Sequence, residues 1–225
     1  MMHGTIRLGV LVAAATLSAS ATCAASVAVR AGAIEYTGDD HVTRTLTAAG
    51  GYEEPALSPD GRTVAFIHVD GPARDGGDDP STSLWIADGP TGQAHRLTGP
   101  HRSDTPAQNF ASFAHPIFSL DGHFIYVSAD AWATSPAVHQ ISVATGQEHF
   151  VIDGGVASLI RTGPWRGYLL VGRHMYYAAP RQGSYDPVFV VRPDGKAMFP
   201  VPGTETDDGA DHVAPWLRAH GWRAW

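Results

Sequence analysis

Pro55-Ala56-Leu57-Ser58-Pro59-Asp60-Gly61 is the most informative segment of this 225-residue chain, and an apolar run, Thr63-Val64-Ala65-Phe66-Ile67, follows one residue later. In the last four residues, serine can hydrogen-bond the backbone at the first turn position and proline presets φ at the second. Aspartate tolerates the third position and glycine suits the fourth. The segment therefore predicts a type I turn between two strands. The second strand is apolar on both alternations, so both of its faces should be buried between neighbouring sheets.

The same pattern occurs twice more. Pro116-Ile117-Phe118-Ser119-Leu120-Asp121-Gly122 precedes the apolar run 124–127, and a degraded copy ends at Gly167 before the run 168–171. Repetition of a strand-turn-strand unit along the chain is typical of repeat architectures.

A second repeat alternates with the first. Thr91-Gly92-Gln93 recurs as Thr145-Gly146-Gln147, 54 residues later, and each copy lies between two short apolar runs. Related turns stand at 37–40 and 193–196. Each complete unit is therefore predicted to contain four strands, in the order hairpin, connection, hairpin.

These residues resemble the TolB-like β-propeller repeat, a WD-like propeller repeat family. Residues 55–61 match its Pro-x-(aromatic or Leu)-Ser-Pro-Asp-Gly pattern in full, residues 116–122 match with Leu120 in place of proline, and the copy ending at Gly167 matches poorly. The resemblance covers about residues 33–203. It implies an all-β propeller of TolB-like four-stranded blades, with about three full blades and a partial or shared fourth. The motif indicates the repeat and says little about function, since both envelope proteins and peptidase propellers contain it.

The first 25 residues resemble a secretory signal peptide. Arg7 precedes the apolar run 8–17, and small residues continue to Ala25. We expect cleavage after Ala24 or Ala25, which would remove Cys23, the only cysteine. Residues 26–225 would then form a single propeller domain in the periplasm or outside the cell, with no membrane-spanning segment after signal cleavage.

Residues 203–225 are expected to form a linker followed by either a strand or a capping helix. Residues 215–221 keep the Pro-x-Leu-x-x-x-Gly spacing of residues 55–61, and a strand there would start a fourth blade that residues 33–47 complete. Alternatively, residues 211–220 form a capping helix with Asp211 as its N-cap. An open fragment that pairs with another chain through exposed edges is the third possibility.

Composition and motifs restrict the function. The net charge of −7 argues against a nucleic-acid partner. No Gly-x-Ser-x-Gly nucleophile motif occurs, and the 12 histidines show no zinc-enzyme spacing. The sequence therefore assigns no catalytic residue, no metal ligand and no cofactor. We expect a non-catalytic module that binds a protein or a cell-envelope component. A metal-dependent lyase or hydrolase that uses channel histidines, and a truncated propeller fragment without independent function, are the alternatives.

The candidate site follows from the position of the repeats. The innermost strand of each propeller blade begins at the mouth of the central channel, where ligands bind. Alignment of the copies on the turn glycine places Glu54, His115 and Arg161 there. Their different chemistry is typical of a binding rim rather than of a packing layer, so we predict that these three residues form the binding site.

Overall fold

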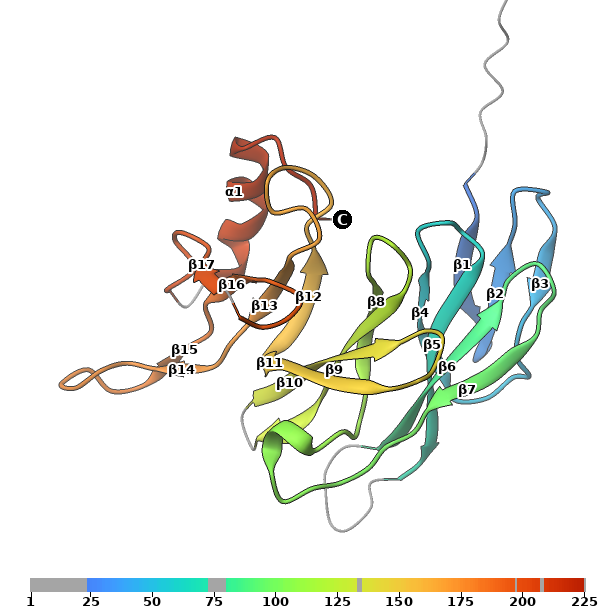
Figure 1. The fold of residues 1–225 in the computed structure, drawn as a ribbon, viewed down its shortest axis with the longest axis horizontal. Helices are drawn as coiled ribbons and strands as arrows, with labels where there is room; N and C mark the ends of the chain where they lie inside the picture. Colours follow the sequence, from blue (N-terminus) through green and yellow to red (C-terminus); the bar gives the residue numbers. More distant parts are fainter. Residues whose placement is uncertain (1–23, 73–79, 133–134, 197, 207–208, 225) are drawn as a thin grey trace, which may run out of the picture.

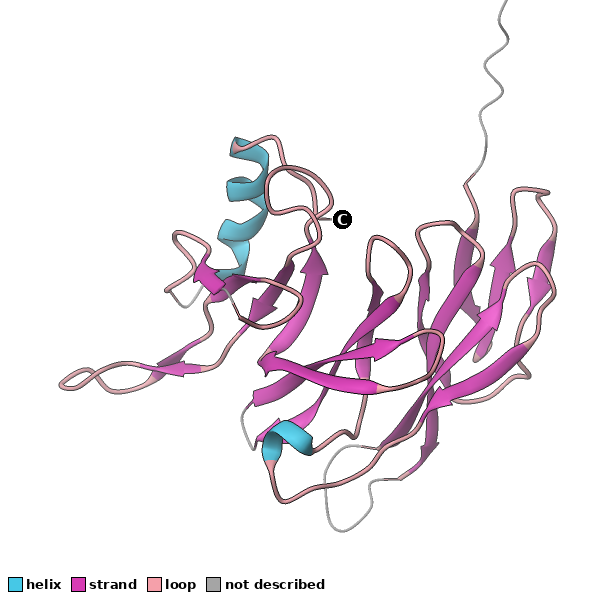
Figure 2. Cartoon of the chain, viewed as in Figure 1, coloured by secondary structure: helices cyan, strands magenta, loops and turns pink. Residues whose placement is uncertain are grey.

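The computed structural model describes residues 24–72, 80–132, 135–196, 198–206 and 209–224. Antiparallel sheets lie side by side in an arc (Figure 1), and helix is confined to short segments, drawn in cyan in Figure 2. The predicted signal peptide lies outside the described residues, apart from its last two positions. No helix within the described ranges has both the length and the apolar character that a membrane crossing requires.

Three of the sheets have four strands, as the two interleaved repeats predict, and we call them blades 1 to 3. Blade 1 contains β4 (Tyr52–Leu57), β5 (Thr63–Gly71), β6 (Ser81–Asp88) and β7 (Ala94–Thr98). Blade 2 contains β8 (Ala114–Phe118), β9 (Phe124–Trp132), β10 (Ser135–Ser142) and β11 (Glu148–Asp153). Blade 3 contains β12 (Gly155–Leu159), β13 (Leu169–Gly172), β16 (Val188–Val191) and β17 (Met198–Pro200).

The remaining strands form smaller units. A three-stranded sheet, which we call the N-terminal sheet, precedes blade 1 and contains β1 (Ser26–Arg30), β2 (Ala33–Thr37) and β3 (Thr43–Thr45). A separate hairpin of β14 (Met175–Tyr176) and β15 (Ser184–Tyr185) projects from blade 3 between β13 and β16 (Figure 1). The expectation of three full blades and a partial fourth is therefore confirmed.

The turn in the repeat motif has the hydrogen bonds that its residues predict. The Gly61 N–H donates to the Ser58 carbonyl over 2.9 Å, and the Ser58 hydroxyl donates to Asp60 and accepts from the Thr63 N–H at 2.8 Å. Gly61 has φ +72°, which a residue with a Cβ rarely adopts. The second copy repeats these contacts around Ser119. The motif therefore specifies a closed, internally bonded hairpin.

The second strand of blade 1 is buried on both faces, as its apolar composition predicts. Val64 and Phe66 pack in one cluster with residues of the N-terminal sheet, whereas Ala65 and Ile67 pack in another with residues of blade 2. All four are fully buried. Because blade 1 lies between the N-terminal sheet and blade 2, a strand with alternating polarity there would place polar side chains in a dry interface.

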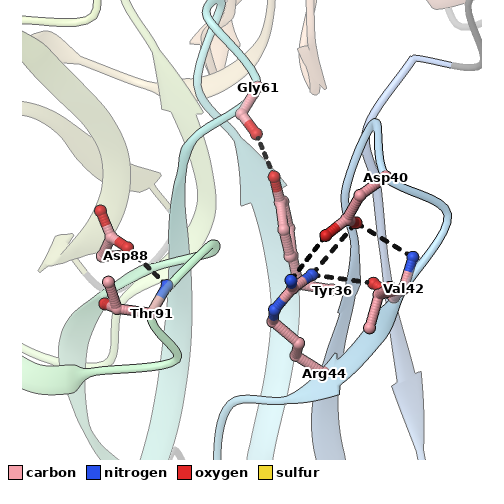
Figure 3. Close-up of polar contacts among 7 residues, drawn as sticks. All are labelled: Tyr36, Asp40, Val42, Arg44, Gly61, Asp88 and Thr91. Carbon is pink, nitrogen blue, oxygen red and sulfur yellow. Dashed lines mark hydrogen bonds and ion pairs between the residues drawn. The ribbon is translucent and has the colours of Figure 1, made fainter.

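Tyr36 joins the N-terminal sheet to blade 1. Its hydroxyl donates to the Gly61 carbonyl over 2.9 Å (Figure 3), and its ring lies so close to Gly89 that a Cβ there would meet it at 2.6 Å. Beside it, Arg44 binds Asp40 at 2.6 Å and lowers the pKa of that carboxyl to about 2. The glycine thus permits the close approach of the two sheets.

The C-terminal segment forms a helix, so of the two alternatives left open by the sequence the structure has the capping helix and not the fourth-blade strand. A 3-10 turn, η2 (Gly209–His212), leads into α1 (Val213–Ala219). Val213 and Leu217 pack against Leu170 and Val190 of blade 3. These face away from the cluster shared with blade 2, so α1 covers the face that a further blade would cover. Asp211 lies inside η2 and His212 is the N-cap, which corrects the predicted cap: the helical turn begins earlier than the sequence suggested.

Candidate functional site

The first strands of the three blades, β4, β8 and β12, run next to one another along the inner side of the arc. Each contains a β-bulge near its beginning, where two residues oppose one on the partner strand or one residue opposes none. In β4 the bulge contains Glu54 and Pro55, and in β8 it contains His115 and Pro116. Equivalent bulges therefore hold two of the three residues that the sequence predicted.

Glu54 and His115 share an uncommon backbone conformation. Their φ values are +49° and +55°, in the left-handed region that side chains with a Cβ disfavour. A non-glycine residue there costs about 1–3 kcal/mol and is often found at functional sites. In this conformation the two side chains no longer follow the regular pattern in which successive residues of a strand point to opposite faces of the sheet.

The structure brings these two side chains together. The His115 backbone N–H donates to the Glu54 carboxylate, and the Nε2 atom of His115 lies 4.0 Å from the other carboxylate oxygen. The His115 side chain is 68% exposed and that of Glu54 is 38% exposed. The backbone hydrogen bond fixes the carboxylate of Glu54. The carboxylate and the imidazole of His115 are both accessible to a ligand from solvent.

Arg161 does not occupy the equivalent position. The strand-ending backbone bonds are Ser58 to Thr63 and Ile160 to Tyr168, so the third copy has three more residues in its turn. Glu54 and His115 lie four residues before Ser58 and Ser119. The residue four positions before Ile160 is Val156, so Val156, which is buried, is their equivalent in the third copy. Arg161 instead follows the far end of β12, roughly 15 Å away at about 3.3 Å per residue. The longer turn shifts the register, so the seven-residue offset that separates Glu54 and His115 from their glycines leads from Gly167 to Ile160, next to Arg161, instead of to Val156.

A pocket of about 290 Å³ lies at this far end, between the ends of the three first strands. Ile117 and Phe118 of β8 and Leu159 of β12 contribute apolar surface, and Arg161 contributes the one charged side chain in the lining. The C-terminal tail closes one side, since the Ser158 hydroxyl donates to the Ala224 carbonyl over 2.7 Å. The predicted residues therefore lie at opposite ends of the row of first strands and do not form one rim.

Metal-ligating side chains do not gather in the described part of the chain: no group of three or more histidine, cysteine, aspartate or glutamate residues there is arranged to hold an ion. His68, in β5, bonds Asp70 at 2.7 Å and is a satisfied structural residue.

The bulges in the first strands were not predicted from the sequence. A signal did exist, since a polar residue stands before proline in both Glu54-Pro55 and His115-Pro116. The α-helical region is disfavoured before proline, so these dipeptides favour irregular strand geometry. The third copy lacks the proline, and Ala157 stands in its place.

Comparison with known proteins identifies the fold but no family. No protein-family model and no curated protein matches the sequence. Among solved structures, dipeptidyl peptidase 4 from Porphyromonas gingivalis matches with TM-score 0.54 and 8% identity, covering 80% of this chain and 31% of that one. The tricorn protease matches with TM-score 0.51 and 15% identity, covering 78% and 15%. The fold is a β-propeller. A putative TolB from Agrobacterium tumefaciens is a looser match, with TM-score 0.46, 17% identity and coverage of 75% and 55%.

The chain thus spans about a third or less of the two better-matched proteins. The likeness is to their propeller domains and extends to the fold alone.

Proposed function

We propose that this chain is a non-catalytic, TolB-like binding module of the periplasm or the cell exterior, and that Glu54 and His115 bind its partner, a protein or a cell-envelope component. One observation carries the proposal. Two residues with left-handed backbone conformation occupy equivalent bulges of β4 and β8, and they contact each other at an exposed position. Backbone strain of this kind persists only where the surrounding structure enforces it, and a purely structural bulge would accept glycine at lower cost.

Two sequence features support the compartment and the class of protein. The leader-like residues 1–25 directly precede the first described strand, since β1 begins at Ser26. The repeat motif at residues 55–61 resembles that of TolB-like propellers, and its turn closes as the motif requires.

The test is photo-crosslinking in native envelopes, followed by recovery of the bound component. His115→Gly removes the imidazole and also relieves the positive-φ strain, so the variant should fold at least as well as the wild type while losing the partner. Glu54→Gln removes the charge and keeps an oxygen acceptor for the His115 N–H. His123→Ala is the matched control, because His123 is an exposed imidazole in the β8–β9 turn, beyond the other end of β8.

Capture by the wild type and by His123→Ala, with loss in the other two variants, is the expected result. Capture that persists in His115→Gly would refute the role of the pair. Recovery of a peptidoglycan-associated lipoprotein would extend the likeness to the Tol–Pal system.

The metal-dependent enzyme gains no support from the described residues, since His115 has one carboxylate and no second imidazole beside it. Tightly bound stoichiometric metal that is lost in His115→Ala would nevertheless favour that alternative.

A further inference from the structure

A second pocket, of about 460 Å³, lies away from the first strands of the blades, on the outer strand of blade 2. It is formed by β11 and by the short 3-10 helix η1 (Pro106–Gln108), which contact each other; η1 is the lower cyan segment in Figure 2. Its lining residues are His101, Ser103, Ala107, Gln108, Glu148, His149 and Phe150. The volume is in the range of small-molecule sites.

The wall behind the pocket is a row of four rings. His101 packs on Phe110 with ring centroids 5.4 Å apart, Phe110 packs on His139 at 5.0 Å, and His139 packs on Phe150 at 5.7 Å. Phe110 and His139 are fully buried, whereas the first and last rings reach the pocket. The row holds the ring of Phe150 in a fixed position at the pocket surface.

His139 is an unusual member of this row because it is buried and only half satisfied. Its Nδ1 atom lies 2.5 Å from the Glu148 carboxylate, whereas its Nε2 atom is buried and has no hydrogen-bond partner in the described residues. An unpaired buried polar atom costs about 1–3 kcal/mol, which a phenylalanine here would avoid. What the imidazole contributes is a fixed orientation of Glu148, whose carboxylate lines the pocket.

The charge of the pocket restricts its ligand. Glu148 is an anion at neutral pH, because the hydrogen bond from His139 and the nearby His101 and His149 lower its pKa. Among the residues that the structure describes, the lining contains no lysine or arginine, so an anionic ligand would be repelled. The hydrogen bond from His139 already occupies one oxygen of the Glu148 carboxylate, which leaves less of it free to bind a cation. Hydroxyl, amide and imidazole groups that both donate and accept make up the rest of the polar lining.

We propose that this pocket binds a neutral sugar unit of an oligosaccharide. Sugar hydroxyls can donate to Glu148 and exchange hydrogen bonds with Gln108, Ser103 and His149, and the apolar face of the ring can pack on Phe150. The site is separate from Glu54 and His115, so the two proposals can fail independently.

Isothermal titration at pH 7 with chitotriose, maltotriose and cellotriose tests the proposal. At least one should bind with a Kd of about 1 mM or tighter. Glu148→Gln keeps an acceptor for His139 and should weaken binding about tenfold, or about 1.4 kcal/mol. Arg218→Ala, on the exposed side of α1 and outside this pocket, is the control and should bind the sugar like the wild type.

His139 is a positioning residue, and a second pair of variants tests that role. His139→Asn can still present an N–H toward Glu148 from a position close to that of Nδ1, whereas His139→Phe cannot. Among correctly folded variants, His139→Asn should retain more sugar affinity than His139→Phe, even if His139→Phe is the more stable.

Three results would overturn the proposal. The first is no saturable binding of any of the three sugars up to about 10 mM, far above the expected Kd. The second is unchanged affinity in Glu148→Gln. The third is saturable binding of L-arginine amide without binding of any sugar, which would make this a cation site.

Discussion

Leu217→Ala measures how much α1 contributes to the stability of blade 3. Leu217 is 2% exposed and packs with Leu170 and Val190 on the face of the blade that a further blade would otherwise cover. Truncation of a buried leucine removes its transfer free energy and leaves a cavity, which together cost 2–5 kcal/mol in well-packed cores. One side of this interface is a single two-turn helix that can move inward, so we expect a loss near the middle of that range, about 3 kcal/mol.

Arg218→Ala is the matched control, since Arg218 is the next residue of the same helix and is exposed. Its free energy of unfolding should stay within about 0.5 kcal/mol of the wild type. Urea denaturation of both variants gives the difference from the midpoints, provided that the m-values agree. In a thermal melt, Leu217→Ala should lower the Tm by about 6–12 °C.

A loss below about 1 kcal/mol in Leu217→Ala would refute the reasoning. It would mean that the face of blade 3 stays dry or stable without the helix, so that α1 is an appendage. A separate early transition, with the rest of the protein unfolding as before, would show that α1 protects only the last blade.

Three further predictions concern the turn, the hydrogen bond between His139 and Glu148, and the leader. Ser58→Ala deletes the hydroxyl that bonds Asp60 and the Thr63 N–H and should cost about 1–2 kcal/mol by urea denaturation, whereas Ser135→Ala, at an exposed strand end, should cost little. The pKa of the Glu148 carboxyl is lower in the folded state than its unfolded value of 4.5. The stability that the ionised carboxylate contributes is therefore complete above pH 4.5 and is lost as the pH falls through the folded pKa. Between pH 6 and pH 3, the Tm should decrease more steeply for the wild type than for Glu148→Gln. Intact-mass measurement of protein secreted by a host with a general secretion pathway should give an N-terminus at Ala25 or Ser26, and retention of Met1 would contradict the leader.

The surfaces at the two ends of the described arc differ from a cut through a closed ring. On the outer face of the N-terminal sheet, Arg30 binds Glu35 at 3.0 Å and the hydroxyls of Thr37 and Thr43 lie 2.9 Å apart. At the other end, α1 covers the apolar side of blade 3. Polar or covered outer faces are what terminal repeats need in order to remain soluble.

Local hydrogen bonding explains why the turns could be predicted from the sequence. Ser58, Asp60 and Gly61 satisfy one another within a few residues, so the same residues give the same turn at Ser119. The third copy has Ile160 where the others have serine, and without that hydroxyl the spacing between strand and glycine is free to change. For this reason Arg161 was wrongly predicted to be equivalent to Glu54 and His115.

Contacts between distant segments explain what could not be predicted. The sugar pocket joins residues 101–108 to residues 148–150, and nothing in either segment indicates that the other lies beside it. His139 is one of 12 histidines, and only its burial among the rings of Phe110 and Phe150 distinguishes it.

The amino-acid pattern alone determined the strands, their grouping in fours and the dryness of both faces of each middle strand, because turn chemistry and side-chain alternation act over a few residues. Packing in three dimensions decided what covers the last blade. Residues 213–219 have apolar side chains that suit either a strand or a helix, and the helix forms because Val213 and Leu217, one turn apart, fit together onto the apolar face of blade 3.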